Sequence, residues 1–463
     1  MFEPKVYSER RDQLRSLVSE GIGLFLGNNE SSINYPDNTY HFRQDSAFLY
    51  FFGHNKPGMA GILDFETGEE ILFGDDIDMD GIIWMGAQPG MADQAEQVGI
   101  KNTRPRSSVA DAVKTALTKG RDVHYLPPYR GDQVIELSEI FSLSNKEARE
   151  KFSVVLIKAV IELRSVKSDI EVAEIEKMVD VAYEMHTTAM KMAYPGILEK
   201  EVFGAVEGVA LSKAYLTSFP IILTINGQIL HNHYHGNMLK EGRLMVTDAG
   251  AESEMGYASD ITRTSPVGGK FSDRQKEIYS IVLKAITETT AATRPGMLYR
   301  DLHLMAARII AGGLKDLGLM NGDLDEIVQA GAHALFFPHG LGHMMGMDVH
   351  DLEGLGENYV GYDDRVKRST QFGTAFLRMG KELKPGYVIT NEPGCYFIPA
   401  LIDKWRGEKK FMEFINYDAV EAYRDFGGIR IEDDVLVTET GSRVLGKPIP
   451  KTIEEVEQTM KKH

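Results

Sequence analysis

The chain has 463 residues and a formal net charge of −17, and 43% of its residues are hydrophobic. A chain of this length is too long for one ordinary hydrophobic core, so two domains are expected. The hydrophobic fraction is normal for a globular protein. The acidic balance argues against nucleic acid as a partner, because a phosphate backbone is bound by clustered lysine and arginine side chains.

Three further features predict a cytoplasmic protein that has no membrane partner. No apolar run approaches the roughly 20 residues of a membrane-spanning helix. The first residues, Met1 to Lys5, lack the basic-then-apolar order of a signal peptide. Cys395 is the single cysteine of the sequence, which excludes an internal disulfide framework.

The N-terminal part of the chain predicts an α/β domain, because short β-prone runs alternate with helical patterns. The expected helices cover residues 7–19, 109–117 and 133–141, and the expected strands cover residues 22–26, 47–52, 60–63, 70–73 and 123–126. Turn residues separate the strands. No cluster of aspartate, glutamate and histidine predicts a site here, so we expect a scaffold or a domain that restricts substrate access.

A domain boundary is expected near residues 163–168, which divides the chain into residues 1–163 and 164–463. Ser168 and Glu171 form a capping box at the start of a long helix. The expected helices of the second domain cover residues 168–193, 199–214, 273–293 and 299–317. Strands follow each pair of helices, which indicates two related halves that offer their strand edges to a shared centre.

Two β-prone runs between the second and third of these helices each carry one aspartate. Asp248 ends the first run, Gly250 lets the chain turn, and Asp260 begins the second run. A carboxylate beside a strand-like core segment is costly to bury unless it is paired or bound to a cation. Two carboxylates at matched places on a hairpin therefore predict a metal site.

A histidine-rich segment at residues 338–351 offers further ligands. His339 and His343 have the spacing of a helical zinc-protease pair, but the glutamate that such a pair needs between its histidines is missing. Gly340 and Gly342 also disfavour a helix. We therefore expect a loop in which one histidine binds metal and others assist catalysis; the alternative is a set of structural hydrogen bonds.

Two later β-prone runs each carry a glutamate. Glu392 ends one run before a Pro-Gly turn, and alternation places Arg430 and Glu432 on one face of the other. Taken singly, these positions also fit a turn residue and a surface ion pair. Taken together, the candidate ligands are four carboxylates and one imidazole: Asp248, Asp260, His343, Glu392 and Glu432. Such a set suits Mn²⁺, Co²⁺, Zn²⁺ or Fe²⁺, and two of the carboxylates can bridge a pair of ions.

These motifs resemble the pita-bread metallopeptidases of the Xaa-Pro branch, namely prolidase and aminopeptidase P. The matching segments follow one another in the family order: residues 247–250, 259–264, 339–343, 348–351, 391–394 and 428–433. Residues 42–48 also resemble the N-terminal domain of this branch. The resemblance implies an α+β protein in which an N-terminal α/β domain precedes a C-terminal pita-bread (creatinase/aminopeptidase-like) catalytic domain.

The resemblance also implies the roles of the ligands. Asp248 would chelate one metal ion, Asp260 and Glu432 would bridge two ions, and His343 and Glu392 would complete the second. Mn²⁺ is the favoured metal, with Co²⁺, Zn²⁺ and Fe²⁺ as alternatives. A water bridging the two ions would be the nucleophile. Glu392 would accept its proton and pass it to the leaving nitrogen.

Histidines complete the implied site. His231 and His350 would lie beside the scissile carbonyl and stabilise the oxyanion or move protons, and His339 would support the substrate from nearby. The assignment of His231 has an alternative. Counting back from Asp248 as in aminopeptidase P selects His231, whereas matching a His-Tyr dipeptide selects His233. We favour His231.

The implied reaction is cleavage of the bond before proline in small peptides, and a homodimer is expected. A dipeptidase must recognise the free carboxylate of proline, a task that suits arginine. Arg378 has the spacing at which prolidases place such a residue, and Arg430 is a second candidate. We favour a prolidase over an aminopeptidase P, which would remove the first residue of Xaa-Pro-Yaa peptides. A non-catalytic peptide-binding protein and a metal-free enzyme are remote alternatives, because all five ligand positions are intact.

Overall fold

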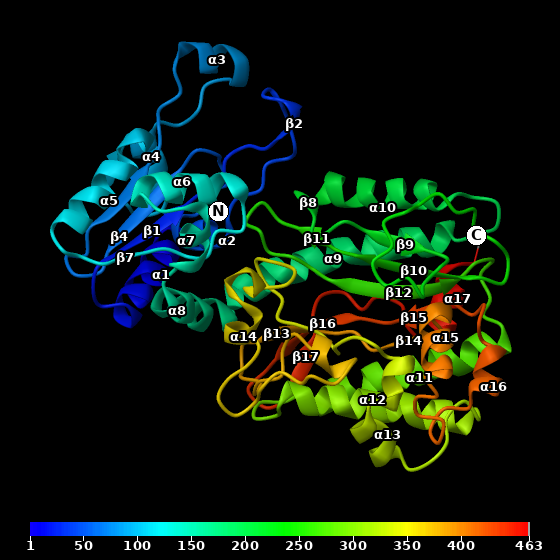
Figure 1. Ribbon diagram of the computed structural model, residues 1–463. Coiled ribbons are helices and arrows are strands. Elements are labelled where there is room, and N and C mark those ends of the chain that lie inside the picture. Colours follow the sequence, from blue (N-terminus) through cyan, green and yellow to red (C-terminus); the bar gives the residue numbers. More distant parts are fainter. Residues whose placement is uncertain (462–463) are drawn as a thin grey trace. The chain divides into compact units, whose positions relative to one another are not determined.

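The computed structural model describes residues 1–461. Its helices and strands form an α+β protein with two compact units (Figure 1). The first unit comprises Met1–Arg164 with two short additions, Glu254–Gly256 and Leu352–Tyr359, and the second comprises the rest of the described chain. Within residues 1–461, no helix has the length and apolar character needed to cross a membrane.

The first unit is built on a mixed five-stranded sheet with the order β6-β5-β4-β1-β7. Its strands are β1 (Ile22–Leu26), β4 (Ala60–Asp64), β5 (Glu70–Phe73), β6 (Asn102–Arg104) and β7 (Val123–His124). The three central strands β5, β4 and β1 are antiparallel to one another, and the outer strands β6 and β7 each run parallel to the strand beside them. Helices cover both faces, which confirms the predicted α/β domain.

Successive side chains of β1 point to opposite faces of the sheet and pack into two different hydrophobic cores. Leu24 packs in a cluster with residues of α5 (Val109–Thr118) and α6 (Gly131–Phe141). Phe25 points the other way, and its ring lies 5.2 Å from that of Phe51 on α2 (Ser46–Phe52). This division follows from the period of two along a strand, and it explains why the whole strand is buried.

The strand predicted at residues 47–52 is wrong, because these residues form the helix α2. The Asp45 side chain accepts a hydrogen bond from the Phe48 N–H at 2.8 Å and caps the helix, and Gly53 closes it with φ 70°. All seven helical residues are buried. A short apolar run that is buried all round has no periodicity with which to tell a helix from a strand.

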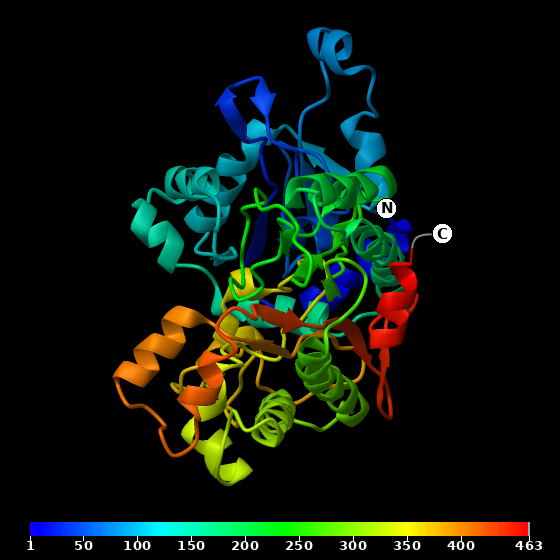
Figure 2. The ribbon, with the colours of Figure 1, turned by 90° about the vertical axis from the view of Figure 1, so that its right-hand side faces the viewer.

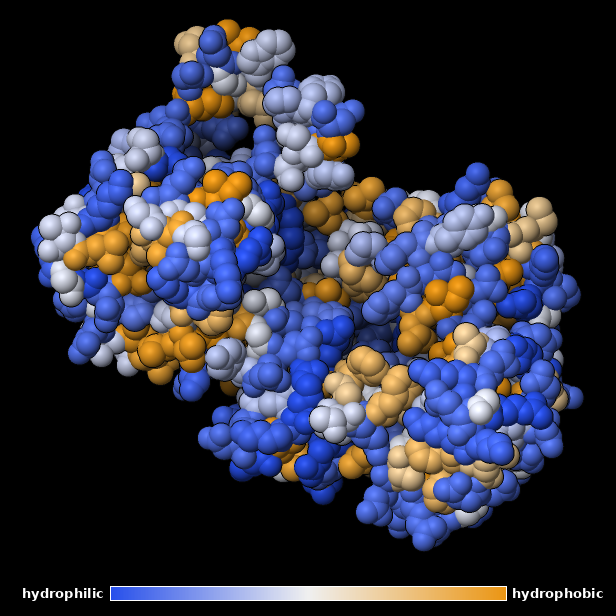
Figure 3. Space-filling view, in the orientation of Figure 1, coloured by the Kyte–Doolittle hydropathy of each residue, from blue (hydrophilic) through white to orange (hydrophobic). Residues whose placement is uncertain are grey.

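Several elements of the first unit were not predicted. They are β2 (Ser32–Tyr35), β3 (Asn38–Thr39), α3 (Met79–Met85), α4 (Met91–Gln97), β6, α7 (Asn145–Glu150) and α8 (Val154–Ser165). The initial helix α1 (Pro4–Leu17) corresponds to the helix predicted at residues 7–19. Helix α3 is unusual because its large apolar residues face solvent: Ile83 is 69% exposed and Trp84 83% exposed. Figure 3 shows hydrophobic residues gathered on this helix, at the top of the view.

The second unit has the predicted order of two helices followed by strands, twice over. The first half contains α9 (Asp169–Met192), α10 (Glu199–Lys213) and a sheet of β9 (Ile222–Thr224), β10 (Leu244–Ala249) and β12 (Ile261–Pro266). The second half contains α11 (Asp273–Ala292), α12 (Tyr299–Asp316) and a sheet of β13 (Val388–Asn391), β16 (Asp433–Val437) and β17 (Ser442–Val444). Both sheets are antiparallel.

The strands of the two halves lie between the helix pairs α9–α10 and α11–α12 (Figures 1 and 2). Two short ribbons extend the sheets, β8 (Leu216–Thr217) with β11 (Ala251–Glu252) and β14 (Gly394–Tyr396) with β15 (Gly428–Arg430). The remaining helices of this unit are α13 (Leu324–Ala330), α15 (Pro399–Gly407), α16 (Tyr417–Glu421) and α17 (Ile453–Thr459). Helix α14 (Glu357–Val360) belongs to the first unit except for its last residue. Every residue of β10 and β12 is buried, so each polar side chain on these strands needs a partner.

Candidate metal centre

The first two candidate ligands are placed by the pairing of β10 with β12. Asp248 pairs with Thr262 and Ala249 with Ile261, so Asp260 is the residue immediately before β12. The chain between the strands passes very close to itself: a Cβ on Gly250 would lie 1.8 Å from the carbonyl oxygen of Ser259. Glycine alone permits this approach, which brings the two carboxylates to the same end of the sheet.

The second half offers Glu392 and Glu432 at the equivalent place. Asn391 pairs with Asp433 in one sheet, and Gly394 pairs with Arg430 in the adjoining ribbon. Both glutamates therefore lie at the junction between the β13–β16 pair of the sheet and the β14–β15 ribbon. The Glu432 N–H donates to the Thr262 carbonyl at 3.0 Å. This bond joins the second half to β12 and places Glu432 beside Asp260.

Residues 337–343 form an irregular loop, as the glycines predicted. A Cβ on Gly342 would lie 2.3 Å from the Thr390 carbonyl oxygen, so the loop lies directly against β13. His343 exchanges two hydrogen bonds with Thr390, through the backbone at 3.0 Å and the threonine hydroxyl at 3.1 Å. The imidazole Nδ1 donates to the Met344 carbonyl at 2.9 Å. A carbonyl can only accept, so Nε2 of a neutral His343 keeps its lone pair for a ligand.

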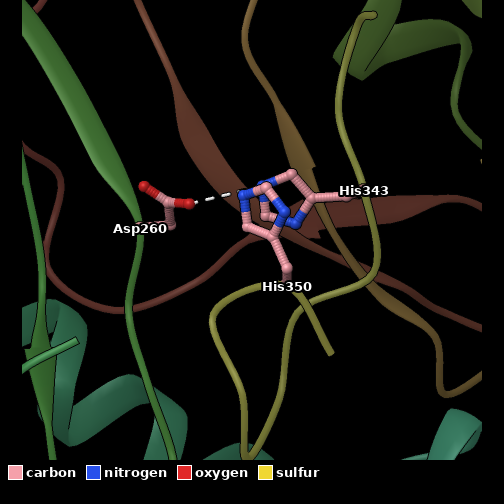
Figure 4. A group of neighbouring side chains, drawn as sticks. All are labelled: Asp260, His343 and His350. Carbon is pink, nitrogen blue, oxygen red and sulfur yellow. Dashed lines mark ion pairs between the residues drawn. The ribbon is translucent and has the colours of Figure 1, made fainter. Parts of the chain in front are cut away.

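The structure brings all five candidate ligands together. Donor atoms lie within 4.8 Å of one another in three groups: Asp248 with Asp260 and Glu432, His343 with Glu392 and Glu432, and Asp260 with His343 and His350. His343 Nε2 lies 3.4 Å from Asp260 Oδ2 (Figure 4) and 3.9 Å from Glu392 Oε1. The groups share members, which is the arrangement that two neighbouring ions require.

The electrostatics of this cluster fit divalent cations. Burial, followed by repulsion from neighbouring carboxylates, raises the pKa of Asp260 and of Glu432 well above the usual range, and burial raises the pKa of Glu392 to about 6. Asp248 Oδ1 is buried and has no hydrogen-bond partner among the described residues. Ionised carboxylates gathered in this way are stabilised by a cation, which supplies the missing charge and ligand bonds.

Arg430 lines the cavity, but its guanidinium is bonded to neighbouring protein groups. Its three guanidinium nitrogens donate to the Asp248 Oδ2 at 2.6 Å, the Tyr396 hydroxyl at 2.8 Å and the Thr262 hydroxyl at 3.1 Å. The side chain is only 5% exposed. A guanidinium whose three nitrogens each donate one bond orients Asp248 and has fewer N–H groups left for a substrate carboxylate.

A continuous hydrogen-bond chain connects His339 to Asp248. His339 Nδ1 contacts the Gly340 carbonyl at 2.8 Å and must donate, so Nε2 accepts from the Tyr396 hydroxyl, also at 2.8 Å. Tyr396 in turn accepts from Arg430. Burial and the charge of Arg430 lower the pKa of His339 to about 3, which keeps this imidazole neutral.

The loop of residues 225–237 carries His231 and His233, and both histidines line the cavity. Between them Asn232 is buried and donates to the Thr224 hydroxyl at 3.1 Å. Burial lowers the pKa of His231, and the charges of Arg430 and Arg378 add to the effect. His231 therefore lies within electrostatic reach of two arginines and, through Asp248, of the candidate metal centre.

Glu199 holds both ends of this histidine loop. The carboxylate is fully buried and accepts from the Ile225 N–H at 2.8 Å, the Asn237 N–H at 3.1 Å and the Asn237 side-chain amide at 2.9 Å. Sequence reasoning missed this residue. The signal that could have drawn attention to it is a repeat: Pro-Gly-x-Leu precedes both Glu199 and Tyr299.

A cavity of about 860 Å³ opens onto the candidate metal centre. His339, His350 and the half-buried Arg378 line it together with the ligands, so all predicted site residues reach one space. His350 also stacks on His343 with 3.9 Å between ring centroids. Much of the remaining wall is apolar, and sequence reasoning did not anticipate its residues: Phe219, Pro220, Ile222, Leu230, Val349, Phe372, Phe376, Ile398, Ala400 and Leu401.

Known proteins with similar sequences and structures share this organisation. The rat (Rattus norvegicus) Xaa-Pro dipeptidase is 32% identical over 455 residues, which is 96% of this chain and 89% of that protein. A probable Xaa-Pro aminopeptidase from Sordaria macrospora is 33% identical over 457 residues, which is 96% of this chain and 93% of that protein. The structure of Pseudomonas aeruginosa aminopeptidase PepP superposes with a TM-score of 0.82 at 29% identity and covers 99% of this chain and 98% of that one.

The family models match both parts of the chain. The model of the aminopeptidase P N-terminal domain matches residues 7–125, and the model of metallopeptidase family M24 matches residues 173–439. The M24 match spans the carboxylates, the histidine loops and the cavity described above. The chain therefore belongs to metallopeptidase family M24, as its motifs indicated.

Proposed function

We propose that this protein is an Xaa-Pro dipeptidase that uses two divalent metal ions to hydrolyse the bond between an N-terminal residue and proline. The observation that carries the proposal is the convergence of five ligand side chains and Arg378 on one cavity. The mammalian dipeptidase relative, which matches almost the full chain, supports the same activity.

The residues present fit a dinuclear centre. Asp248 would hold one ion, His343 and Glu392 the other, and Asp260 and Glu432 would bridge them. Bound ions would lower the pKa of a shared water towards 7 and so make it a nucleophile at neutral pH. Four carboxylates and one imidazole favour Mn²⁺, with Co²⁺, Zn²⁺ and Fe²⁺ as alternatives. Metal analysis of protein purified without added metal tests this assignment.

Glu392 has the position of a proton carrier. Its side chain is 19% exposed and lines the cavity, whereas the side chain of Asp260 is 7% exposed. A carboxylate with access to both the nucleophile and the substrate can accept a proton from the water and deliver it to the proline nitrogen. That nitrogen must be protonated to leave as an amine, because the unprotonated nitrogen anion is a very poor leaving group.

His231 and His350 would stabilise the developing oxyanion. Both line the cavity, and both lie beside the ligand cluster, His350 by stacking on His343. His233 lines the cavity as well and stays the alternative to His231. We favour His231 because the charges of Arg430, Asp248 and Arg378 all act on it. We expect His231→Ala to lose far more activity than His233→Ala. Equal, small losses in the two variants would show that neither histidine stabilises the oxyanion.

Arg378 is the proposed partner of the proline carboxylate. It lines the cavity, and its charge acts on both His231 and Glu392. Arg430 is the weaker candidate, since its three nitrogens already bind protein groups. Arg378→Ala should therefore lower turnover of Xaa-Pro dipeptides selectively, and steady-state kinetics with Mn²⁺ measures this. Purified wild-type protein that cleaves Xaa-Pro-Yaa tripeptides well and dipeptides hardly at all would disprove the dipeptidase assignment.

The second candidate function is that of an Xaa-Pro aminopeptidase. The fungal relative and the Pseudomonas structure favour it, and so does a cavity of about 860 Å³, which is large for a dipeptide. Both candidates share the chemistry at the metal centre and differ only in how the substrate continues after proline. Parallel assays of dipeptides and tripeptides separate them.

We also propose that the protein forms a homodimer, that residues 1–163 are a domain of the aminopeptidase P N-terminal type, and that residues 164–463 are catalytic. The exposed apolar residues of α3 support the dimer, because an exposed patch of this kind commonly marks a protein interface. Light scattering of the wild type and of Trp84→Ser tests it. The cytoplasmic location stays a prediction.

A further inference from the structure

The acidic and the basic side chains that line the cavity fall into separate groups. The carboxylates that line it belong to the candidate metal centre, and Arg430 is bonded to one of them. Two further cations line the wall, Arg378 and Lys404. Lys404 is exposed, and it has no ion pair or side-chain hydrogen bond among the described residues. The proposed function uses Arg378 and leaves Lys404 without a role.

An aromatic surface lies beside Lys404. The Phe372 ring contacts those of Phe376 at 5.9 Å and Trp405 at 5.7 Å, which packs residues 372–376 against α15. Phe376 is nevertheless 55% exposed and Phe372 38% exposed, and both line the cavity. Large aromatic side chains that keep their faces open inside a cavity form a ready binding surface for an apolar group.

Helix α15 continues this surface towards the lysine. Ala400 and Leu401 line the cavity, and Lys404 follows Ala400 by four residues, which puts it one turn further along the same helical face. An apolar wall thus leads to a cation. The arrangement matches a peptide residue with an apolar side chain and a free carboxylate.

The volume of the cavity is consistent with a longer ligand. Pockets of roughly 300–1,000 Å³ hold drug-sized molecules, so a cavity of about 860 Å³ has room for a third residue after the two that a dipeptide supplies. Arg378 acts electrostatically on His231 and so lies towards the catalytic end. The two cations therefore suit carboxylates at two different distances from the scissile bond.

We propose that Phe372, Phe376 and Leu401 form a subsite for the residue after proline and that Lys404 binds the carboxylate of that residue. The inference rests on the proposed function and extends its substrate class to Xaa-Pro-Yaa tripeptides with a large apolar Yaa. Arg378 would then bind the carboxylate of dipeptides, and Lys404 that of tripeptides.

Kinetics of the metal-loaded full chain with four peptides tests this subsite: Xaa-Pro, Xaa-Pro-Gly, Xaa-Pro-Phe and Xaa-Pro-Phe amide. The wild type should prefer Phe over Gly after proline by about tenfold in kcat/KM, because an aromatic side chain gains buried apolar contact. Phe376→Ala should abolish that preference. Lys404→Met should lower the ratio of Xaa-Pro-Phe to Xaa-Pro turnover by about threefold to fivefold, the size expected for an exposed ion pair.

Two controls make the lysine result specific. The amide has no carboxylate, so Lys404→Met should not change its kcat/KM relative to Xaa-Pro. Lys284→Met, which removes an exposed lysine on α11 outside the cavity, should leave all ratios unchanged. Equal use of Xaa-Pro-Phe and its amide by the wild type, or an unchanged ratio in Lys404→Met, would overturn the role of Lys404.

The same assays distinguish failure of the proposed subsite from failure of the proposed function on which it rests. Cleavage of dipeptides with no cleavage of any tripeptide would refute the subsite and leave the dipeptidase intact. No cleavage of any peptide would refute the proposed function. In that case calorimetric titration with Pro-Phe, the product of tripeptide cleavage, decides the subsite: wild-type binding that Lys404→Met weakens supports it, and equal binding refutes it.

Discussion

The two halves of the second unit use one scaffold for different tasks. Pro-Gly-x-Leu precedes α10 in the first half and α12 in the second, and the next residue, Glu199 or Tyr299, is the first residue of each helix. Both side chains are buried. Glu199 accepts hydrogen bonds from the two ends of the histidine loop, whereas the Tyr299 hydroxyl donates to the Thr390 carbonyl at 2.6 Å.

This difference shows how equivalent positions come to hold different segments. The first half holds a long loop whose free N–H groups need an acceptor, and a carboxylate can satisfy several donors at once. The second half holds strand β13, whose carbonyl needs a donor, and a phenol provides one. Each residue is therefore suited to the segment that carries its half's proposed catalytic groups, which are His231 in the loop of one half and Glu392 in the other.

The largest effects should come from the candidate ligands, of which the first half supplies Asp248 as the proposed ligand of one ion and Asp260 as the proposed bridge. Asp260→Ala should disturb both ions, whereas Asp248→Ala should chiefly empty one site. Both should lose at least about a thousandfold in kcat, because the activated water depends on the ions. Metal content per chain, measured by mass spectrometry, distinguishes the variants. The same metal content in both would contradict the assignment of Asp260 as the bridge.

The contact of β12 with Asp433, which we call the seam between the two halves, should lose much of its contribution to stability on substitution or in acid. Arg263 on β12 donates to Asp433 of the second half at 2.6 Å, and both side chains are 2% exposed. Asp433→Asn leaves a buried guanidinium without its counter-charge and should lower the free energy of unfolding by about 3–5 kcal/mol at pH 7. Urea unfolding of the metal-free protein measures the loss. A change below about 1 kcal/mol would show that the seam does not depend on this pair.

The pH dependence of the same pair has a definite sign. Burial alone would raise the pKa of Asp433, but the charges of Arg263 and Lys451 outweigh it and lower the pKa to about 2, from an ordinary value of 3.8. A depressed carboxylate pKa contributes stability that is full above the unfolded pKa. This contribution should disappear as pH falls from about 3.8 towards 2. The stability difference between wild type and Asp433→Asn should therefore shrink across that window.

Glu199→Gln should sharpen the comparison of the two helix starts. The amide cannot accept from Asn237 through its nitrogen, so the histidine loop loses hydrogen bonds that are worth about 1–3 kcal/mol when their donors stay buried. We expect kcat to fall about tenfold while bound metal is unchanged, because His231 is displaced and the ligands are not. In a His231→Ala background Glu199→Gln should cost nothing further in kcat. Additive losses in kcat would show that Glu199 acts independently of His231.

Glu201→Gln is the matched control for that variant. Glu201 lies two residues further on the same helix, and within residues 1–461 its carboxylate accepts only from the exposed Leu198 N–H at 2.8 Å. An amide oxygen can replace this acceptor, so kcat should stay within about twofold of the wild type.

The smallest effect should come from Tyr299→Phe. It removes one buried hydrogen bond and leaves the Thr390 carbonyl without this donor, at a cost of about 1 kcal/mol in stability. Because β13 is also held by its pairing with β16, we expect less than about threefold loss of kcat. A loss as large as that of Glu199→Gln would show that the two halves depend equally on their first helical residues.

Local patterns in the sequence were sufficient for much of this protein. The strand ends that carry Asp248, Asp260 and Glu392 were evident because apolar runs, turn glycines and isolated carboxylates are adjacent in the chain. The paired helices were predicted within one or two residues for the same reason: capping boxes and Pro-Gly stops are local signals. The predicted strand at residues 47–52 failed because complete burial removes the periodicity on which such a prediction depends.

Long-range partners were decided only by the tertiary structure. The sequence placed Arg430 near the site, yet a single strand could not reveal that Asp248, Tyr396 and Thr262, from three other segments, would occupy its nitrogens. Lys404 carries no motif, and Glu199 is marked only by the Pro-Gly-x-Leu repeat that precedes it. Their significance comes from the loop that one holds and the cavity that the other lines, and a chain brings such residues together only by folding, since hydrogen bonds and cavities depend on distances in space rather than along the sequence.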